Sequence, residues 1–353
     1  MLSVGTFVLV SIIKTVIALV VLLTAVAYSV WLERKVVGHM QNRWGPTRVG
    51  PFGLLQPLAD GAKFLLKEDL TPPYVYKPLY IAAPMIAVVF ALTSIAVIPV
   101  GNSVSLFGIT TPLQITDVNI GLLVVLGVTS LGVYGIALAG WSSNSKYSLL
   151  GGLRASAQMV SYEIALGLSL IGVMITAGSF SLRDIVDAQG GTFLGFIPRW
   201  NIFQGQFVAF FIYLMAAFAE TNRIPFDLPE AETELVAGYH TEYSAMKFAM
   251  FFMAEYANMI TVACLASLLF LGGWHQPIGS EAWMQNAPQI VQAILPIFWF
   301  ALRIFGFIFL YIWIRGTLPR FRYDQLMAFG WKFLFPLAIA NLIVTALIVA
   351  LKS

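Results

Sequence analysis

Residues 7–31 read FVLVSIIKTVIALVVLLTAVAYSVW, a stretch of 25 residues in which Lys14 is the only charged side chain. A helix needs about 20 apolar residues to cross a bilayer. Seven further windows have the same character: 78–99, 119–140, 159–178, 205–219, 244–271, 290–314 and 332–351. Barrel strands would instead show short alternating runs. We therefore predict an all-α polytopic membrane protein with about eight transmembrane helices, in which residues 1–353 form a single integral membrane domain.

The amino-acid composition excludes several classes of protein. Of the 353 residues, 59% are apolar and only 10% are charged, whereas a soluble domain carries roughly 25% charged residues. Lys and Arg number 20 against 17 Asp and Glu, without the basic block of a nucleic-acid binder. The single cysteine excludes a disulfide framework, an iron–sulfur site and a CxxC zinc site within the chain. Nucleotide-binding glycine loops and hydrolase motifs are also missing, so we expect this chain to bind no metal, nucleotide or flavin itself.

The distribution of Lys and Arg predicts the orientation. The loop between residues 31 and 78 is rich in them, and the third, fifth and seventh loops also carry them. Loop four has Arg183 and Arg199, while loops two and six have none. Because short basic loops stay in the cytoplasm, we expect the odd loops inside and both termini on the outer, periplasmic side. The first apolar run leads directly into Glu33, so we expect an uncleaved span and not a signal peptide.

The first inner loop is expected to contain an amphipathic helix at about 52–67. Leucines recur on one face at helical spacing, and another face carries Gln56, Asp60, Lys63 and Lys67. This pattern is typical of a helix that lies along a membrane surface or covers a crevice. Before it runs RWGPTRVGP at 43–51, a turn punctuated by Gly and Pro. Two interpretations stay open here: a basic segment held to anionic headgroups, and the gate of a lateral opening.

The fifth inner loop, residues 220–243, is acidic. It carries Glu220, Asp227, Glu230, Glu232, Glu234 and Glu242, with Arg223 as its one base. Pro225 and Pro229 prevent these acids from forming one solvated helical face. One interpretation is a solvated loop that docks a basic partner subunit. We favour carboxylates that share protons at the membrane boundary, because acids held close together raise one another's pKa and further acids lie inside the membrane.

Those further charged residues lie within the predicted spans. Glu163 is near the start of the fourth span, and Arg303 lies within the seventh. Lys247 and Glu255 are two turns apart on one face of the sixth. Because charge is costly in lipid, each should face the bundle interior or water. For Arg303 we favour a pair that fixes helix packing, and for Glu163 and Glu255 we favour proton conduction.

Four blocks of sequence resemble one family. They are ERKVVG at 33–38 with GLLQPLAD at 53–60, GWSSNSKYSLLGGLRASAQMVSYE at 140–163, AETNRIPFDLPEAETELVAGYHTEYSAMKF at 219–248 with FFMAEY at 251–256, and RGTLPRFRYDQLM at 315–327. All four look like the family of the membrane H subunit of proton-pumping NADH:quinone oxidoreductase (complex I), which includes mitochondrial NADH dehydrogenase subunit 1. The resemblance covers nearly the whole chain, from about Tyr28 to Pro336.

The resemblance implies a position at the heel of the membrane arm, where this chain and two peripheral subunits would enclose a chamber for reduction of a lipid quinone. The implied quinone-chamber residues are Glu33, Arg34, Lys35, Arg43, Ala59, Asp60, Lys63, Phe226, Arg315 and Arg320. The implied proton path comprises Glu163, Glu220, Asp227, Glu230, Glu232, Glu234, Glu242, Lys247 and Glu255. The chain alone would hold no complete active site, and NADH, FMN and iron–sulfur clusters would be bound by partner subunits.

Three alternatives stay open. One is the equivalent subunit of a related quinone- or ferredoxin-linked complex or of a membrane-bound hydrogenase. The second is a stand-alone proton-coupled transporter, which predicts internal inverted repeats that the sequence does not show. The third is a purely structural docking subunit, against which the intramembrane acids argue. In each case we expect contact with membrane lipids, and we place the protein in a bacterial cytoplasmic (inner) membrane, with an organellar inner membrane as the alternative.

Overall fold

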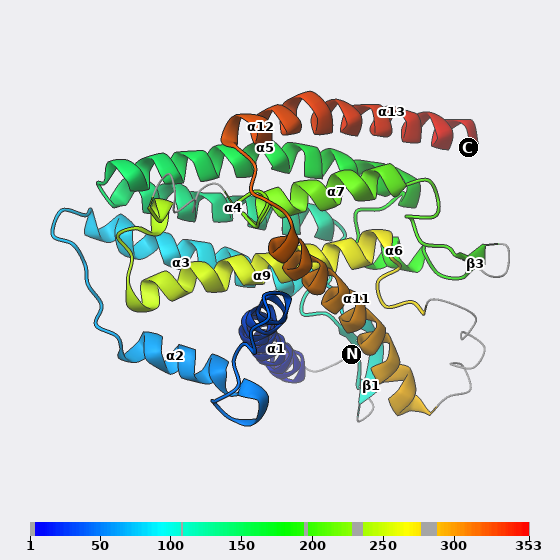
Figure 1. Ribbon diagram of the computed structural model, residues 1–353. Coiled ribbons are helices and arrows are strands. Elements are labelled where there is room, and N and C mark those ends of the chain that lie inside the picture. The colour runs from blue at the N-terminus through cyan, green and yellow to red at the C-terminus, as the bar shows by residue number, and fades with distance from the viewer. Residues whose placement is uncertain (1–3, 107–108, 194–196, 228–235, 277–287, 353) are drawn as a thin grey trace.

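The structure is a computed structural model that describes residues 4–106, 109–193, 197–227, 236–276 and 288–352. This part of the chain is mostly helical, as predicted (Figure 1). The long helices are α1 (Val4–Met40), α3 (Lys77–Thr93), α4 (Gly121–Ser142), α5 (Lys146–Ala177), α7 (Phe207–Glu220), α9 (Ala245–Phe270), α11 (Gln289–Thr317) and α13 (Phe335–Lys352). The short helices are α2 (Gln56–Leu66), α6 (Leu182–Asp187) and α12 (Tyr323–Phe329).

Short turns and hairpins complete the chain. Single 3-10 turns are found at η1 (Pro51–Gly53), η2 (Ser94–Val97) and η3 (Gly238–His240), and a π-helical stretch, η4 (Gly330–Leu334), joins α12 to α13. Two antiparallel hairpins pair β1 (Gly101–Leu106) with β2 (Ile109–Leu113) and β3 (Thr192–Phe193) with β4 (Ile197–Pro198). The sequence analysis predicted neither hairpin, because both are shorter or more polar than a span.

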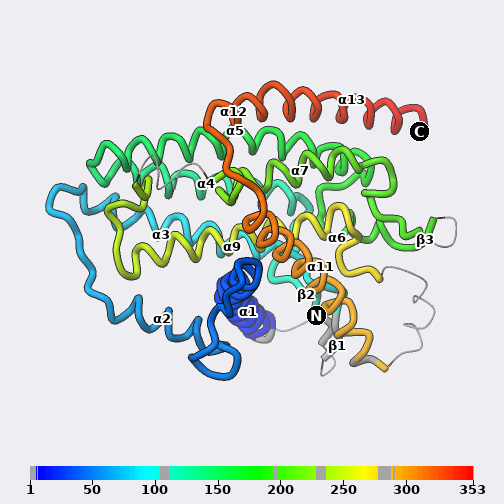
Figure 2. The backbone as a smooth tube through the Cα atoms, viewed as in Figure 1, coloured from blue at the N-terminus to red at the C-terminus, as the bar shows by residue number. Residues whose placement is uncertain are grey.

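Helices α3, α4, α5, α7 and α9 form a central bundle. α3 packs against α4 and α9, while α5 packs against α4, α7 and α13. α1 and α11 contact each other and α9, and they cross the bundle at a steep angle (Figure 1). α2 lies at one end of the bundle, whereas α6 and β3 lie at the opposite end (Figure 2).

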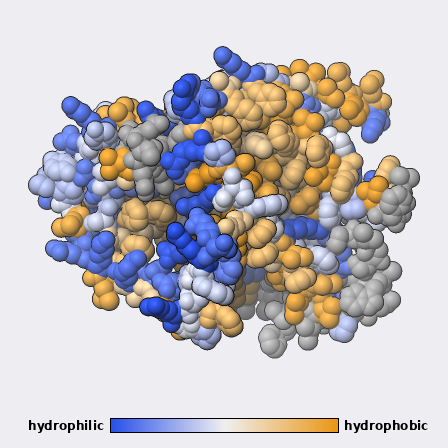
Figure 3. Space-filling model, viewed as in Figure 1, coloured by the Kyte–Doolittle hydropathy of each residue, from blue (hydrophilic) through white to orange (hydrophobic). Residues whose placement is uncertain are grey.

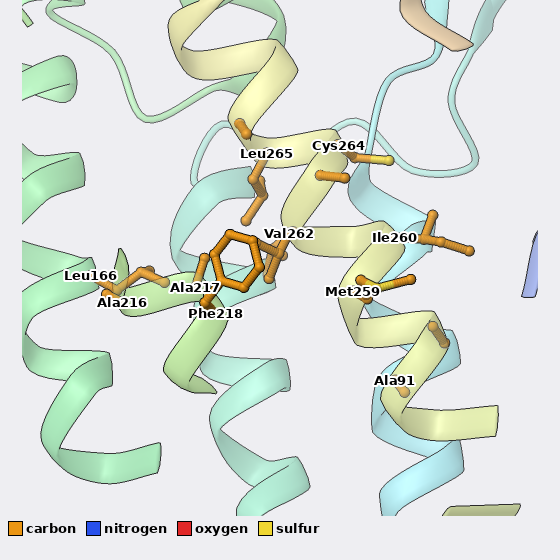
Figure 4. Packing of buried hydrophobic residues seen from close by; sticks show 14 of the residues in the cluster. Ala91, Leu166, Ala216, Ala217, Phe218, Met259, Ile260, Val262, Cys264 and Leu265 are labelled. Atoms are coloured by element: carbon orange, nitrogen blue, oxygen red, sulfur yellow. The ribbon is translucent and has the colours of Figure 1, made fainter. Parts of the chain in front are cut away.

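Small and apolar side chains allow the bundle helices to approach closely. In Figure 4, Leu166 of α5, Ala217 of α7 and Val262 of α9 lie within one apolar layer, and all three are nearly inaccessible to solvent. At the α3–α4 contact, a Cβ added to Gly135 would lie 2.9 Å from the Cβ of Ala87. Without a hydrophobic drive between helices in lipid, such close packing by small residues holds a membrane bundle together.

Seven of the described helical segments are long and apolar enough to cross a membrane: Phe7–Met40, Lys77–Val97, Gly121–Ser142, Lys146–Ala177, Ala245–Phe270, Val291–Thr317 and Tyr323–Lys352. They contain all or most of the predicted windows other than 205–219. That window coincides with α7, an apolar helix that is 14 residues long and therefore shorter than a standard span. The eighth span stays a prediction.

The boundaries of several predicted elements differ from the structure. α1 continues to Met40, beyond the predicted end at residue 31, so that Glu33 lies on a helix and not in a loop. α5 begins at Lys146 and not near 159, since its polar first turns continue the helix beyond the apolar stretch. Close packing makes this extension possible, because a Cβ on Gly151 would lie 2.7 Å from the Cα of Gly238. The amphipathic helix is confirmed as α2, which starts at Gln56 after the turn through Gly53, whose φ is 78°.

The surface agrees with a protein that meets both lipid and water. Hydrophobic residues cover α13, where Ile343, Val344 and Leu347 are each more than half exposed (Figure 3). Hydrophilic residues gather in this view over α2 and the segment between α11 and α12. An apolar helix face of this kind is stable when lipid or another subunit covers it.

Candidate functional site

The site is built around a group that we call the central cluster: Glu33, Arg223, Glu255, Tyr256 and Arg315, of which Arg315 is exposed, with a side chain 39% accessible. Glu33 lies on α1 and is only 8% exposed. Its carboxylate accepts hydrogen bonds from Arg223 at 3.3 Å, from the Tyr256 hydroxyl at 2.8 Å and from Arg315. The turn after α7 and the helices α9 and α11 therefore converge on one acid of α1.

Arg223 joins the two acids of the central cluster. Its Nε lies 2.7 Å from Oε1 of Glu255, and its Nη1 lies 3.3 Å from Oε2 of Glu33. The guanidinium also lies 4.1 Å from the centre of the Tyr256 ring. Buried charges are stable only when opposite charges pair with them. Arg315 also pairs with Glu33, so both arginines of the cluster are engaged with its acids.

The polar face of α2 is attached to α1 next to the central cluster. Arg34 donates to Asp60 at 2.6 Å, Gln56 donates to the same carboxylate at 3.1 Å, and Lys63 lies 3.7 Å from it. Ala59 beside Asp60 is half-buried. These contacts place α2 beside the C-terminal end of α1, so four predicted chamber residues are neighbours.

Two other predicted chamber residues make contacts elsewhere: Lys35 lies near the C-terminal end of α1, and Arg43 lies in the segment that follows this helix. Lys35 donates to the carbonyl oxygen of Pro46 at 3.0 Å and so fixes the Gly/Pro turn. Arg43 is exposed in this chain. Neither side chain reaches the central cluster, and a role for them in the chamber stays a prediction.

The start of the acidic loop is attached to the segment between α11 and α12. Arg320 donates to Asp227 at 3.0 Å, and the rings of Phe226 and Phe321 stack with centres 5.5 Å apart. On α5, the buried amide of Gln158 donates to the carbonyl oxygens of both Ala219 at 2.9 Å and Phe226 at 2.8 Å. The turn that carries Arg223 is therefore held from two sides.

A small polar cavity separates the central cluster from a second pair of acids. It has a volume of about 30 Å³ and is lined by Glu255, Glu220 and Asn258 among others. A cavity of roughly this size holds one or two water molecules when polar groups line it. Beyond Glu220, the carboxylate of Glu163 accepts a hydrogen bond from Ser130 and is near enough to Glu220 for electrostatic interaction. The structure thus arranges Glu33, Glu255, Glu220 and Glu163 in a row.

The chain matches known proteins along nearly its whole length. A family model described as NADH dehydrogenase matches residues 13–346. The chain belongs to this NADH dehydrogenase family. Its sequence is 71% identical to the NADH-quinone oxidoreductase H subunit numbered 2 of Koribacter versatilis, with 99% of each chain covered. It is 51% identical to the H subunit numbered 1 of the same oxidoreductase in Solibacter usitatus, with 98% of each covered. It is 49% identical to the protein of that name in Geobacter sulfurreducens, with 96% of this chain and 95% of that protein covered.

Family membership confirms the resemblance drawn from the four sequence blocks. The relatives carry the name of one subunit of an oxidoreductase, and the seven apolar helices make this NADH dehydrogenase family member an integral membrane protein. Within the described residues, no group of three or more His, Cys, Asp and Glu side chains is arranged to hold a metal ion.

Sequence reasoning missed two members of the central cluster. Arg223 was noted as the one base of the acidic loop, which was a usable signal, because a lone cation among acids is a natural partner for them. Nothing in the sequence indicated that Tyr256 belongs to the site, except that it directly follows Glu255. Ser130 was also missed, since a serine inside an apolar helix is usually bonded to its own backbone, as Ser130 also is at 2.7 Å.

Several predicted proton-path residues do not join the row. Glu242 accepts a hydrogen bond from the hydroxyl of Tyr74 at 2.6 Å, and Lys247 forms an ion pair with Asp69 at 2.9 Å. Both therefore contact the segment between α2 and α3, and their part in a proton path stays a prediction. Residues outside the described part of the chain are Glu230, Glu232 and Glu234.

An apolar crevice lies between α1, α9 and α11. Its volume is about 440 Å³, which is within the range of small-molecule sites. Leu22, Cys264 and Phe300 line it, together with further aliphatic and aromatic side chains. One end is formed by the α1 residues 28–32, which directly precede Glu33. The crevice and the central cluster therefore adjoin along α1, where one end of the crevice is followed by Glu33.

Two further ionisable side chains, Arg303 and His240, make contacts that indicate a structural role. Arg303 donates to the carbonyl oxygens of Gly273 and His275 and stacks over Trp200 at 4.7 Å, which agrees with a packing role, although backbone carbonyls replace the expected charged partner. His240 is enclosed by aromatic rings, including that of Phe252 at 5.6 Å. Burial lowers the pKa of His240 to about 3, so its ring is neutral at physiological pH.

Proposed function

We propose that this chain is the membrane subunit of a respiratory NADH:quinone oxidoreductase that forms much of the quinone chamber and couples quinone reduction to proton translocation. Its family membership and the names of its relatives support this assignment. The observation that carries the mechanism is the central cluster, in which Arg223 lies between Glu33 and Glu255. NADH, FMN and iron–sulfur clusters then belong to partner subunits, which deliver electrons to the chamber.

The apolar crevice supports a site for a lipid quinone. A quinone combines a long apolar tail with a polar head that carries two carbonyl oxygens. The tail fits a crevice lined by α1, α9 and α11, and the end of this crevice is followed by Glu33. Arg315 and Tyr256 place cationic and hydroxyl donors around that residue. On this proposal, the reducible head lies near the inner end of α1, under α2.

The central cluster supports the coupling step. Reduction of the quinone adds negative charge in a partly dry site, where charges act over longer distances than in water. That charge attracts Arg223, whose contact with Glu255 then weakens. An uncompensated buried carboxylate takes up a proton. The proton can pass through the small cavity to Glu220 and on to Glu163, toward partner subunits of the membrane arm that pump.

In the proposed topology the chain crosses the membrane eight times. α7 is short, but it lies between α5 and α9 in the bundle, which supports its assignment as the eighth span. The basic first, third, fifth and seventh loops then face the cytoplasm, and both termini face the periplasm. A single integral membrane domain in the bacterial cytoplasmic membrane follows, with an organellar inner membrane as the alternative.

The variant Glu33→Gln tests the proposal in the assembled complex. It keeps the shape of the side chain but removes the charge that Arg223 and Arg315 share. We expect quinone reduction by NADH to fall by at least about tenfold, since hydrogen bonds to charged groups contribute roughly 1.5–3 kcal/mol. Electron transfer from NADH to a hydrophilic artificial acceptor, which needs no quinone site, should be unchanged.

Glu68→Gln is the matched control. Glu68 is an exposed acid of the same inner loop, and its side chain makes no hydrogen bond or ion pair with the described residues. We expect this variant to behave like the wild type. If Glu33→Gln does so as well, in a complex with all its subunits, the central cluster is not part of the quinone chamber.

A further inference from the structure

Residues 68–76, which make up most of the connection between α2 and α3, lie against the start of α9, and we call them the strap. Its Asp69 forms an ion pair with Lys247 at 2.9 Å, and Lys247 also donates to the hydroxyl of Thr71 at 2.7 Å. The hydroxyl of Ser244 accepts from the backbone N–H of Leu70 at 3.1 Å and donates to the carbonyl oxygen of the same residue at 3.2 Å. Two residues at the start of α9 therefore hold three consecutive residues of the strap.

Tyrosines fix the other end of the strap. Tyr74 donates to the carboxylate of Glu242 at 2.6 Å, and this hydrogen bond raises the pKa of Tyr74. Tyr80, at the start of α3, donates to the backbone carbonyl of Glu242 at 2.6 Å. The rings of Tyr80 and Tyr243 are stacked, with centres 4.2 Å apart and planes 7° from parallel. The end of the acidic loop is thus packed against the first inner loop.

The contacts of Lys247 differ from those of Glu255, although both residues lie on α9. Lys247 stands eight residues before Glu255 on α9, which corresponds to about 12 Å along the helix. Its ammonium group lies 5.1 Å from the centre of the Tyr80 ring, and the side chain is 14% exposed. Lys247 therefore contacts the strap and not the row of acids that begins at Glu33.

The strap continues directly from α2. At its inner face α2 is attached to α1 through Arg34 and Asp60, and Phe64 of α2 packs toward Phe248 of α9 with ring centres 6.5 Å apart. Lys247 lies one residue before Phe248. Beside the direct contacts of α2 with α1 and α9, the strap therefore ties the end of this helix to the same first turn of α9.

We propose that Lys247 is a positioning residue for the quinone chamber: it keeps the strap closed and thereby holds α2 over the inner end of α1. This inference rests on the proposed function, since it assigns α2 to the wall of the chamber. It replaces the proton-path role that the spacing of Lys247 and Glu255 suggested. A closed strap fixes the shape of the site, so its loss should weaken quinone binding more than the electron-transfer step.

The first test measures quinone kinetics in the assembled complex with Lys247→Met and Lys247→Arg. Asp69 is half exposed, and a pair of this kind contributes modestly, so we expect the KM for quinone to rise about fivefold in Lys247→Met, with kcat within about twofold of wild type. Lys247→Arg should restore most of the affinity, because a guanidinium can still pair with Asp69. Lys67→Met is the matched control, since Lys67 is an exposed lysine of the same loop.

The outcomes separate three cases. A wild-type KM in Lys247→Met, when Glu33→Gln is impaired, overturns the positioning role alone. A lower proton-to-electron ratio at an unchanged KM also overturns it and returns Lys247 to the proton path. Wild-type turnover in Glu33→Gln instead overturns the chamber assignment, whatever Lys247 does.

The second test closes the strap covalently with the double variant Leu70→Cys and Ser244→Cys. The backbone of Leu70 is bonded to the side chain of Ser244, and the single native cysteine, Cys264, is buried on α9. We expect the oxidised, cross-linked complex to reduce quinone at nearly the rate of its reduced form, because the strap stays closed during turnover. A loss of activity on cross-linking that a reductant reverses would show that the strap must open, and would overturn the proposal.

Discussion

Replacing Arg223 with methionine is the most informative single change in this protein. Methionine has a similar length but no charge, so the variant removes the cation that lies 2.7 Å from Glu255 and 3.3 Å from Glu33. Glu33 retains the contacts of Tyr256 and Arg315. For Glu255, Arg223 supplies the one ion pair found within the described part of the chain. The variant therefore acts mainly on Glu255.

The magnitude follows from burial. The side chains of Arg223 and Glu255 are 7% and 13% exposed, and removal of one partner from a buried pair costs about 3–5 kcal/mol. The carboxyl group avoids that cost by staying protonated, which removes it from a cycle of proton uptake and release. Ionising Glu255 again during each cycle would then cost this free energy, and since about 1.4 kcal/mol corresponds to a factor of ten, we expect coupled quinone reduction to fall by roughly a hundredfold or more.

The assay compares purified complexes in sealed vesicles. NADH oxidation by quinone and proton pumping should fall together in Arg223→Met, while NADH oxidation by a hydrophilic artificial acceptor should keep its wild-type rate. Arg223→Lys should retain more activity, because it keeps the charge but not the two-sided geometry. Arg199→Met is the control for a cation on an exposed position. A fully assembled Arg223→Met complex with turnover within about twofold of wild type would refute the reasoning.

Three further predictions address the cavity, the acidic loop and pH. Gly132→Ala adds a methyl group that meets no heavy atom within 4 Å in the small cavity, so it should displace water and slow turnover without changing the quinone KM, whereas Gly127→Ala on the same helix should have no effect. Glu230→Gln or Glu232→Gln should reduce coupled quinone reductase activity with assembly intact, and wild-type turnover and pumping in both would contradict their place in the path. Burial lowers the pKa of His240 from 6.5 to about 3, so between these pH values the native state binds fewer protons than the unfolded state. The contribution of neutral His240 to the free energy of unfolding is therefore fully present above pH 6.5 and is lost as the pH falls toward 3. His240→Phe should flatten this part of the thermal-unfolding profile, and an unchanged slope would disprove the assignment.

The apolar windows predicted the long helices because a membrane span is a run of about 20 consecutive apolar residues, which can be recognised in the sequence without knowledge of distant contacts. The same reasoning misplaced the start of α5, where polar residues continue the helix from Lys146. Helical hydrogen bonds and the close approach of Gly151 to Gly238 extend this element beyond the apolar stretch. The π-helical join before α13 had no hydropathy signal either.

The acids of the site were also recognisable from the sequence, but their partners were not. Glu33 and Arg223 are 190 positions apart, and only the packing of α1 against the bundle brings them together. Lys247 illustrates the converse. Its helical spacing from Glu255 indicated a shared face, yet contacts with Asp69 in the strap decide its surroundings. Spacing within one helix predicts which residues share a face, but the neighbouring element determines what that face meets.

The proposed coupling requires that reduction of the quinone changes the protonation of Glu255. Infrared difference spectroscopy of the assembled complex, recorded between its quinone-oxidised and quinone-reduced states, measures this through the carboxyl stretching band. We expect a band for a newly protonated carboxyl group on reduction, lost in Glu255→Gln and changed in Arg223→Met. An identical difference spectrum in wild type and Glu255→Gln would contradict the coupling mechanism.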